Sequence, residues 1–133
     1  MKNEWQHKDE WKLSGKGFIV QVTRHSTMLS DFAFDEGPHR WAVYTYIYPQ
    51  HPYFAEIVGT DMCQDSTAAM PLHCGASYLV RHVHGGKEAS IQVGEDYNHL
   101  HDSRYTHYET KEDARSVFMD AEELFNWLQD RAA

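Results

Sequence analysis

Apolar residues at three- and four-residue steps near the C-terminus constrain this chain most strongly. The spacing is typical of an amphipathic helix, and the residues that carry it are Ala114, Val117, Phe118, Ala121, Leu124, Phe125 and Leu128. Thr110 and Asp113 precede them as a capping box, with Asp in place of the usual Glu. Because such a helix must bury its apolar stripe against another element, the rest of the chain has to supply a partner layer.

Strand-like segments precede this helix. Residues 18–23 and 41–48 are rich in β-branched and aromatic side chains. Gly85-Gly86 suits a two-residue turn and predicts a hairpin of residues 77–84 and 87–94. Counting outward from the turn pairs Tyr78 with Val93, Val80 with Ile91, and His82 with Ala89. Residues 53–60 fit either a strand or a helical turn.

These patterns predict one α+β domain over residues 1–133. We expect an antiparallel sheet of four to five strands, one long C-terminal helix packed on it, and two long loops. Residues 1–14 are mostly polar and are expected to form a loosely ordered lead-in. The helix residues Phe118, Leu124 and Phe125 are predicted to pack on one face of the hairpin, formed by Tyr78, Val80, Ile91 and Val93.

The charge balance disfavours nucleic acid as a partner. Twenty acidic residues stand against twelve Lys and Arg, a formal net charge of −8, so the basic footprint of a phosphate-binding surface is missing. No apolar run approaches the roughly 18 residues of a membrane helix, and the first residues lack an apolar signal core. We therefore expect a cytoplasmic protein whose two cysteines, Cys63 and Cys74, are reduced and partly buried.

Histidines and carboxylates gather in three Gly- or Pro-containing segments, residues 49–53, 71–78 and 94–102. Imidazole and carboxylate together suit zinc, iron or manganese. The candidate ligands are His73, Asp96, His99 and Asp102, with His51 and His101 as further candidates. The alternative is that these side chains cap turns and hydrogen-bond loop backbone.

Side chains of this kind beside turn-forming residues predict an organised cluster. We expect at least three of five residues to lie in contact, directly or through water; the five are His51, His73, Asp96, His99 and Asp102. The cluster would hold either a divalent metal or a hydrogen-bond network that pins the loops to the sheet.

The same three segments resemble a family of small uncharacterised proteins of tailed phages and prophages. The shared motifs are His51-Pro52 after a strand, then His73-Cys74-Gly75-Ala76-Ser77-Tyr78, then Gly94-x-Asp96-x-x-His99-x-x-Asp102. The resemblance covers residues 11–130 and implies a phage accessory protein in the cytoplasm of a bacterial host. Cys74 stands where the family has a glycine, and a positive φ there would strain a cysteine by about 1 kcal/mol.

Two functions remain open at this point. The first is an accessory protein that binds a host or phage protein, including a host defence factor; exposed tyrosines would serve such an interface, and the candidates are Tyr44, Tyr46, Tyr48, Tyr53 and Tyr105. The alternative is a metal-binding protein or metal-dependent hydrolase that uses the His/Asp cluster to polarise a substrate or activate water.

Overall fold

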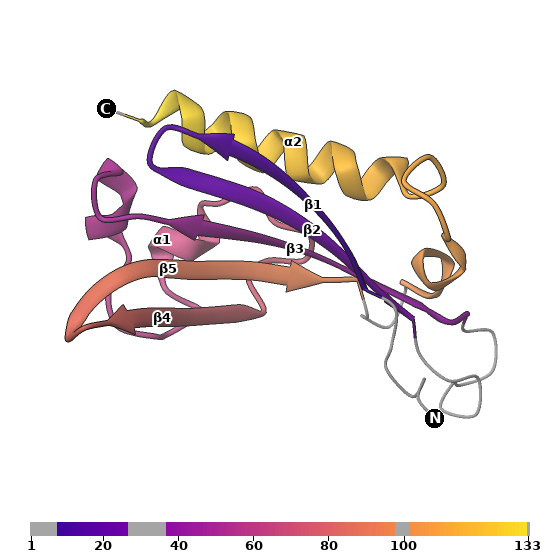
Figure 1. Cartoon of the computed structure of the whole chain (residues 1–133), viewed down its shortest axis with the longest axis horizontal. Coiled ribbons are helices and arrows are strands. Elements are labelled where there is room, and N and C mark those ends of the chain that lie inside the picture. The colour runs from indigo at the N-terminus through magenta and orange to yellow at the C-terminus, as the bar shows by residue number, and fades with distance from the viewer. Residues whose placement is uncertain (1–7, 27–36, 98–101, 133) are drawn as a thin grey trace.

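Five antiparallel strands form one sheet in the order β1-β2-β3-β5-β4 (Figure 1). The computed structural model describes residues 8–26, 37–97 and 102–132. The strands are β1 (Lys8–Gly15), β2 (Phe18–Ser26), β3 (His39–Ile47), β4 (Tyr78–His84) and β5 (Lys87–Asp96). One long helix, α2 (Arg115–Asp130), completes the α+β arrangement that the sequence predicts.

The apolar stripe of α2 forms much of the core. Val117, Leu124 and Leu128 have no exposed surface, as the three- and four-residue spacing predicts. Before the helix begins, the Asp113 N–H donates to Thr110 Oγ1 at 3.1 Å and the Thr110 N–H donates back to Asp113 Oδ2 at 3.4 Å. Neither α2 nor any other helix in the described ranges has the length and apolar character needed to cross a membrane.

The helix packs on β1, β2 and β3, so the predicted packing on the hairpin is wrong. Phe118 meets Trp11 and Trp41 edge-on at centroid distances of 5.2 and 5.9 Å. Phe125 lies 5.1 Å from Phe18, and both helix phenylalanines are half-buried. In Figure 1, α2 accordingly runs beside β1 and β2, on the far side of the sheet's centre from β4.

Strand β1 corrects the expectation of a loosely ordered lead-in for residues 8–14, while residues 1–7 lie outside the described residues. Its residues pair in register with β2, from Lys8 opposite His25 to Gly15 opposite Phe18. Trp11 and Leu13 alternate with charged side chains, which is the pattern of a strand with one covered face. Gly17 closes the turn at a φ of 83°, where a Cβ atom would lie 3.2 Å from His51.

The hairpin of β4 and β5 forms at Gly85-Gly86, but its register differs from the prediction. A bulge between His82 and Val83 shifts the pairing by one residue, so Leu79 lies opposite Val93 and Val80 opposite Gln92. Since a shift of one residue moves a strand's side chains to the other face, Ile91 and Val93 join the core on the covered face of the sheet, away from Val80.

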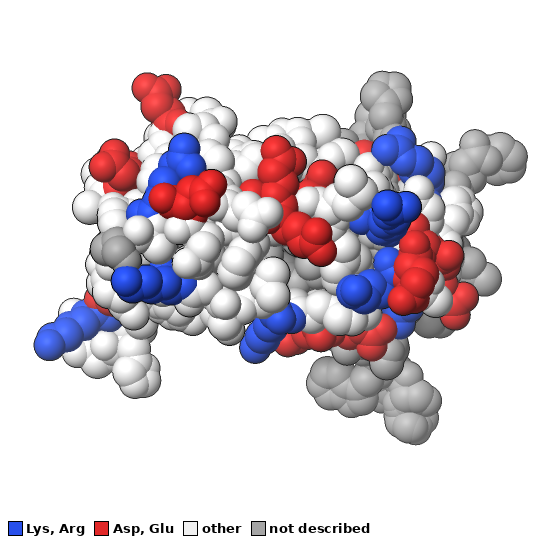
Figure 2. Space-filling view, turned by 90° about the horizontal axis from the view of Figure 1, so that it is seen from above, with Lys and Arg blue, Asp and Glu red and all other residues white. Residues whose placement is uncertain are grey.

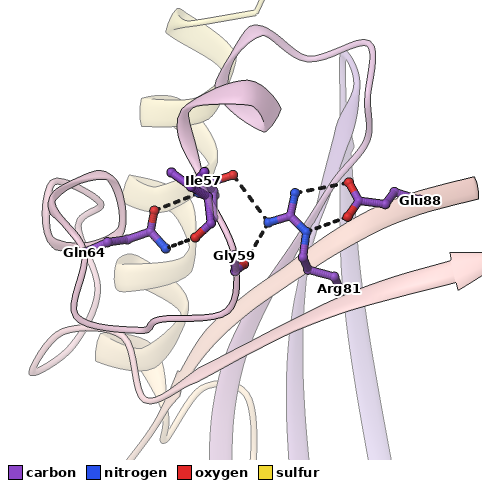
Figure 3. A network of polar contacts seen from close by, with 6 residues as sticks. Ile57, Gly59, Gln64, Arg81 and Glu88 are labelled. Carbon is purple, nitrogen blue, oxygen red and sulfur yellow. Dashed lines mark hydrogen bonds and ion pairs between the residues drawn. The ribbon is translucent and has the colours of Figure 1, made fainter.

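The segment between β3 and β4 covers the remainder of the face on which α2 lies. It holds a 3₁₀ turn, η2 (Pro52–Glu56), and a short helix, α1 (Asp65–Ala68), and it buries Ile57 and Met70 in the core. The ambiguous residues 53–60 are thus partly helical. Arg81 anchors this segment: its guanidinium donates to the carbonyls of Ile57 and Gly59 and forms a two-pronged ion pair with Glu88 (Figure 3).

Candidate functional site

His73 lies at the centre of a buried polar network at the end of β5. Its Nε2 atom is 2.9 and 3.1 Å from the two carboxylate oxygens of Asp102, and its backbone N–H donates to Glu95 Oε1 at 2.6 Å. Asp102 immediately precedes a second 3₁₀ turn, η3 (Ser103–His107). The network therefore joins the loop before β4 and the loop after β5 to the same strand.

Glu95 is a buried acid within this network. Its side chain is 1% exposed, and its Oε2 atom has no hydrogen-bond partner among the described residues. Burial raises the pKa of the Glu95 carboxyl to about 8, because the ionised form would lose its hydration; the N–H of His73 lowers the pKa but does not offset burial. Glu95 therefore keeps its proton at neutral pH.

Aromatic rings cover the imidazole of His73. Tyr97 stacks on it with ring centroids 4.3 Å apart, and Tyr105 meets it edge-on at 5.5 Å. Tyr97 has no exposed surface; its hydroxyl donates to Asp120 Oδ2 on α2 at 2.6 Å, and burial raises the pKa of that hydroxyl. Only 19% of the His73 side chain is exposed. The contacts of His73 and Tyr97 fasten the loop before β4 and the loop after β5 to the sheet and to α2.

Cys74 has a positive φ, the condition under which a cysteine at this position would be strained. Its φ is 58°, in the left-handed region that favours glycine. Cys63 and Cys74 are both free, as expected, but they are exposed rather than partly buried. Both lie in turns of the segment between β3 and β4, where the backbone directs side chains to solvent.

His51 lies at the opposite end of the sheet, so the prediction that it joins His73 is wrong. It contacts Phe18, which pairs with Ile47 at the end of β3, whereas Tyr97, which stacks on His73, donates its backbone N–H to the carbonyl of Trp41 near the start of β3. Its Nδ1 accepts the N–H of Tyr53 at 3.0 Å, and its Nε2–H donates to the carbonyl of Leu128 at 2.9 Å. Both ring nitrogens are thus used by the main chain, and His51 is not placed to bind a metal.

The remaining predicted ligands divide between two situations. Asp96 follows Glu95 on β5 and lies opposite Ala42, so it belongs to the other face of the sheet. His99 and His101 lie outside the described residues. Within the described residues, His73 and Asp102 are in contact, and no group of three possible ligands is placed to hold a metal ion. A zinc, iron or manganese site that includes His99 or His101 stays a prediction.

The face of the sheet opposite α2 carries a second set of side chains, which we call the tyrosine face: Tyr44, Tyr46, Tyr78, His82 and Gln92. Tyr44 and Tyr78 meet at 5.4 Å in an edge contact, and Tyr46 stacks on His82 at 5.8 Å. The Nε2–H of His82 donates to Gln92 Oε1 at 2.7 Å. None of the five belongs to the apolar core or to the residues packed against it.

Two of the tyrosines predicted to be exposed, Tyr44 and Tyr46, belong to the tyrosine face. Tyr44 and Tyr46 lie on it half-exposed. Tyr105 is buried, and the Tyr53 ring packs on Trp127 while its hydroxyl donates to the Ser66 carbonyl. These two tyrosines therefore serve the fold, because the segments that carry them lie on the covered face.

Comparison of the chain with protein-family models, with curated proteins and with solved structures finds no match. The resemblance to proteins of tailed phages therefore stays a prediction, and the site has to be interpreted from its own geometry.

Proposed function

We propose that this chain acts by binding another protein through the tyrosine face. The observation that carries the proposal is the position of these aromatic, imidazole and amide side chains on the one face of the sheet that neither α2 nor the segment between β3 and β4 covers. Tyrosine combines a large apolar surface with a hydrogen-bonding tip, and it is enriched at protein interfaces for that reason.

The ring contacts within the tyrosine face support a preformed interface. Tyr44 packs against Tyr78. Tyr46 on β3 stacks on His82 of β4, and Gln92 of β5 holds His82 by a hydrogen bond. Side chains that are already ordered lose less conformational entropy when a partner binds. Tyr78 is nevertheless 38% exposed, which leaves contact area for that partner.

Charge favours a protein over a nucleic acid as the partner. The five residues of the tyrosine face include no Lys or Arg, although Lys12 and Arg40 lie on the same side of the sheet. The whole chain carries a net charge of −8, so phosphate groups would gain little from it. Figure 2 shows acidic and basic side chains interspersed on the side of α2, without a continuous basic surface there.

The resemblance to phage proteins supports a host or phage protein as the partner, a host defence factor included, in the cytoplasm of the bacterial host. The metal-dependent alternative rests on His73, Asp96, His99 and Asp102 and gains no support from the described part of the chain, which leaves out His99 and His101.

Site-specific photocrosslinking tests the proposal. A photoreactive phenylalanine at Tyr44 should give one discrete adduct in bacterial cells that express the chain, and the same residue at Met119, on the exposed side of α2, is the matched control. The partner identified from the adduct is then purified. We expect Tyr78→Ala to weaken its binding at least about tenfold and Met119→Ala to leave binding unchanged. Adducts from Met119 alone, or full affinity in Tyr78→Ala, would overturn the proposal.

A further inference from the structure

Strand β1 forms one edge of the sheet. It pairs with β2 on one side, and no strand within the described residues pairs with its other side. An edge strand presents a row of backbone N–H and C=O groups that can pair with a further strand. The question is which strand would fit.

The charges of β1 are complementary to those of β1 itself. Glu10 and Lys12 flank Trp11, and both lie on the face of the sheet away from α2. If two copies of β1 run antiparallel and are centred on Trp11, Glu10 of each copy lies directly opposite Lys12 of the other. We propose that two copies of this chain associate edge to edge in this register and form one continuous sheet.

Neighbouring registers lack this complementarity. Directly opposite residues must share a face, so the alternatives are shifts of two residues in either direction. One shift places Glu10 opposite Glu10, and the other places Lys12 opposite Lys12. Like charges directly opposite are destabilising in a sheet, and the charge pattern therefore selects the register centred on Trp11.

The apolar side of β1 also favours a second copy. Trp11 and Leu13 line a groove of about 230 Å³ between β1 and α2, with Phe118 and Ala121 on the helix side. Leu13 is 46% exposed, an open apolar side chain on an edge strand. In the proposed register the two Trp11 residues are cross-strand neighbours, and Leu13 lies diagonal to Trp11 of the second copy, within reach of a large aromatic ring.

Order and charge at β1 are suited to self-association. Trp11 is held between Trp41, stacked at 5.6 Å, and Phe118. Gln21 donates to Glu10 Oε1 at 3.1 Å and steadies that carboxylate on the sheet surface. The sequence of β1, KDEWKLSG, contains as many lysines as acidic residues. Two chains that each carry a net charge of −8 can therefore approach at β1 without local repulsion.

Charge exchange between two variants tests both the edge and the register. Sedimentation of the full chain should show a reversible dimer. E10K and K12E should each weaken dimerisation at least about tenfold, because both cross-strand pairs become like-charged. An equimolar mixture of the two variants should associate as strongly as wild type. In the mixed dimer, two lysines of the E10K chain face two glutamates of the K12E chain, so both cross-strand pairs again have opposite charges. K87E, at the β4–β5 turn, is the control and should dimerise normally.

The wild-type chain provides a second measurement that needs no substitution. The amides of β1 should become more protected from hydrogen exchange as protein concentration rises, while those of β4 should not change. A chain that remains monomeric at about 200 µM overturns the proposal, as does a dimer that K12E leaves intact. Failure of the mixture to restore association overturns the register. None of these results depends on the tyrosine face, so the proposed function is tested separately.

Discussion

His51 and His73 each fasten a loop at one end of the sheet, but their partners differ. The ring nitrogens of His51 bond to main-chain groups of Tyr53 and Leu128, and the ring packs on Phe18. His73 lies among acids, with Asp102 on its ring and Glu95 on its backbone N–H.

This difference separates two ways of stabilising a loop. The His51 end contributes packing and hydrogen bonds between peptide groups and one imidazole. The His73 end includes a carboxyl whose pKa burial raises to about 8. We therefore expect substitutions at His51 to change stability most, and pH to act on the fold mainly through the His73 end.

The largest effect is expected from His51→Ala. The change leaves a cavity beside Phe18 and deprives the buried carbonyl of Leu128 and the N–H of Tyr53 of their partners. We expect the free energy of unfolding in urea to fall by about 3–5 kcal/mol. His82→Ala, on the half-exposed tyrosine face, is the control and should cost about 1 kcal/mol. A loss below about 1 kcal/mol at His51 would show that the main-chain bonds contribute little.

The variant Glu95→Gln tests whether the stability of the His73 end depends on pH. The native carboxyl titrates near pH 8 and the unfolded one near its ordinary value of 4.5. Between these two pH values, the native state therefore binds more protons than the unfolded state. The stability that Glu95 contributes is therefore full below about pH 4.5 and is lost as the pH rises towards 8, by up to about 1.4 kcal/mol per pH unit.

Urea denaturation between pH 5 and 8 checks this expectation. Glu95→Gln removes the titration. As the pH rises from 5 to 8, the free energy of unfolding of the variant should therefore increase by about 3 kcal/mol relative to that of wild type. The exposed Glu88→Gln should show no such gain, because the Arg81 guanidinium lowers the pKa of Glu88 and moves its titration below this range. A variant that tracks wild type at every pH would mean that Glu95 is ionised in the native state.

Asp102→Asn should have a smaller and local effect. The amide keeps the size of the side chain but removes the charge that favours the contact with His73 Nε2, and the expected cost is about 1–2 kcal/mol. Hydrogen exchange should accelerate at residues 72–75 and 103–107 and stay unchanged around His51. Asp130→Asn, at the exposed end of α2, is the control. Uniform acceleration over the chain would contradict a local role for this pair.

The smallest effect is expected from Cys74→Gly, and it is a gain. Glycine accommodates the φ of 58° without the strain of a Cβ atom, so thermal unfolding should indicate about 0.5–1 kcal/mol of added stability. Cys63→Gly, where the backbone is not left-handed, should be neutral or destabilising. A loss at both positions would mean that the Cys74 side chain makes contacts that outweigh its strain.

The sequence predicts the elements whose patterns are local. The spacing of Val117, Leu124 and Leu128 predicts α2, and Gly85-Gly86 predicts the β4–β5 turn. Strand β1 was missed because charged residues surround Trp11 and Leu13 and hide a two-residue alternation that is present in the sequence. The register of the hairpin was wrong because a bulge adds one residue without a glycine to mark it.

Placement across the sheet was the harder part of the site to predict. The contact of His73 with Asp102 follows from the motifs, but the separation of His51 depends on which end of β3 meets the loop after β5. Asp96 was assigned to the cluster although its neighbour Glu95 occupies the covered face, and neighbouring strand residues point apart. Tyr97 and Asp120 were missed because they are joined only through the packing of α2 on the sheet.

The bulge in β4 has a consequence for how far an edge-to-edge assembly can grow. A sheet with two regular edges could add copies at both ends and lengthen into a fibre. Here the bulge at His82 and Val83 distorts the outer edge, and Arg81 and Glu88 form an ion pair beside it. Pairing through β1 uses the same edge of both copies, so the proposed dimer presents only two irregular edges to solvent. In the proposed dimer, growth would stop at two chains, and the protein would stay dispersed at concentrations where an open-ended sheet would form filaments.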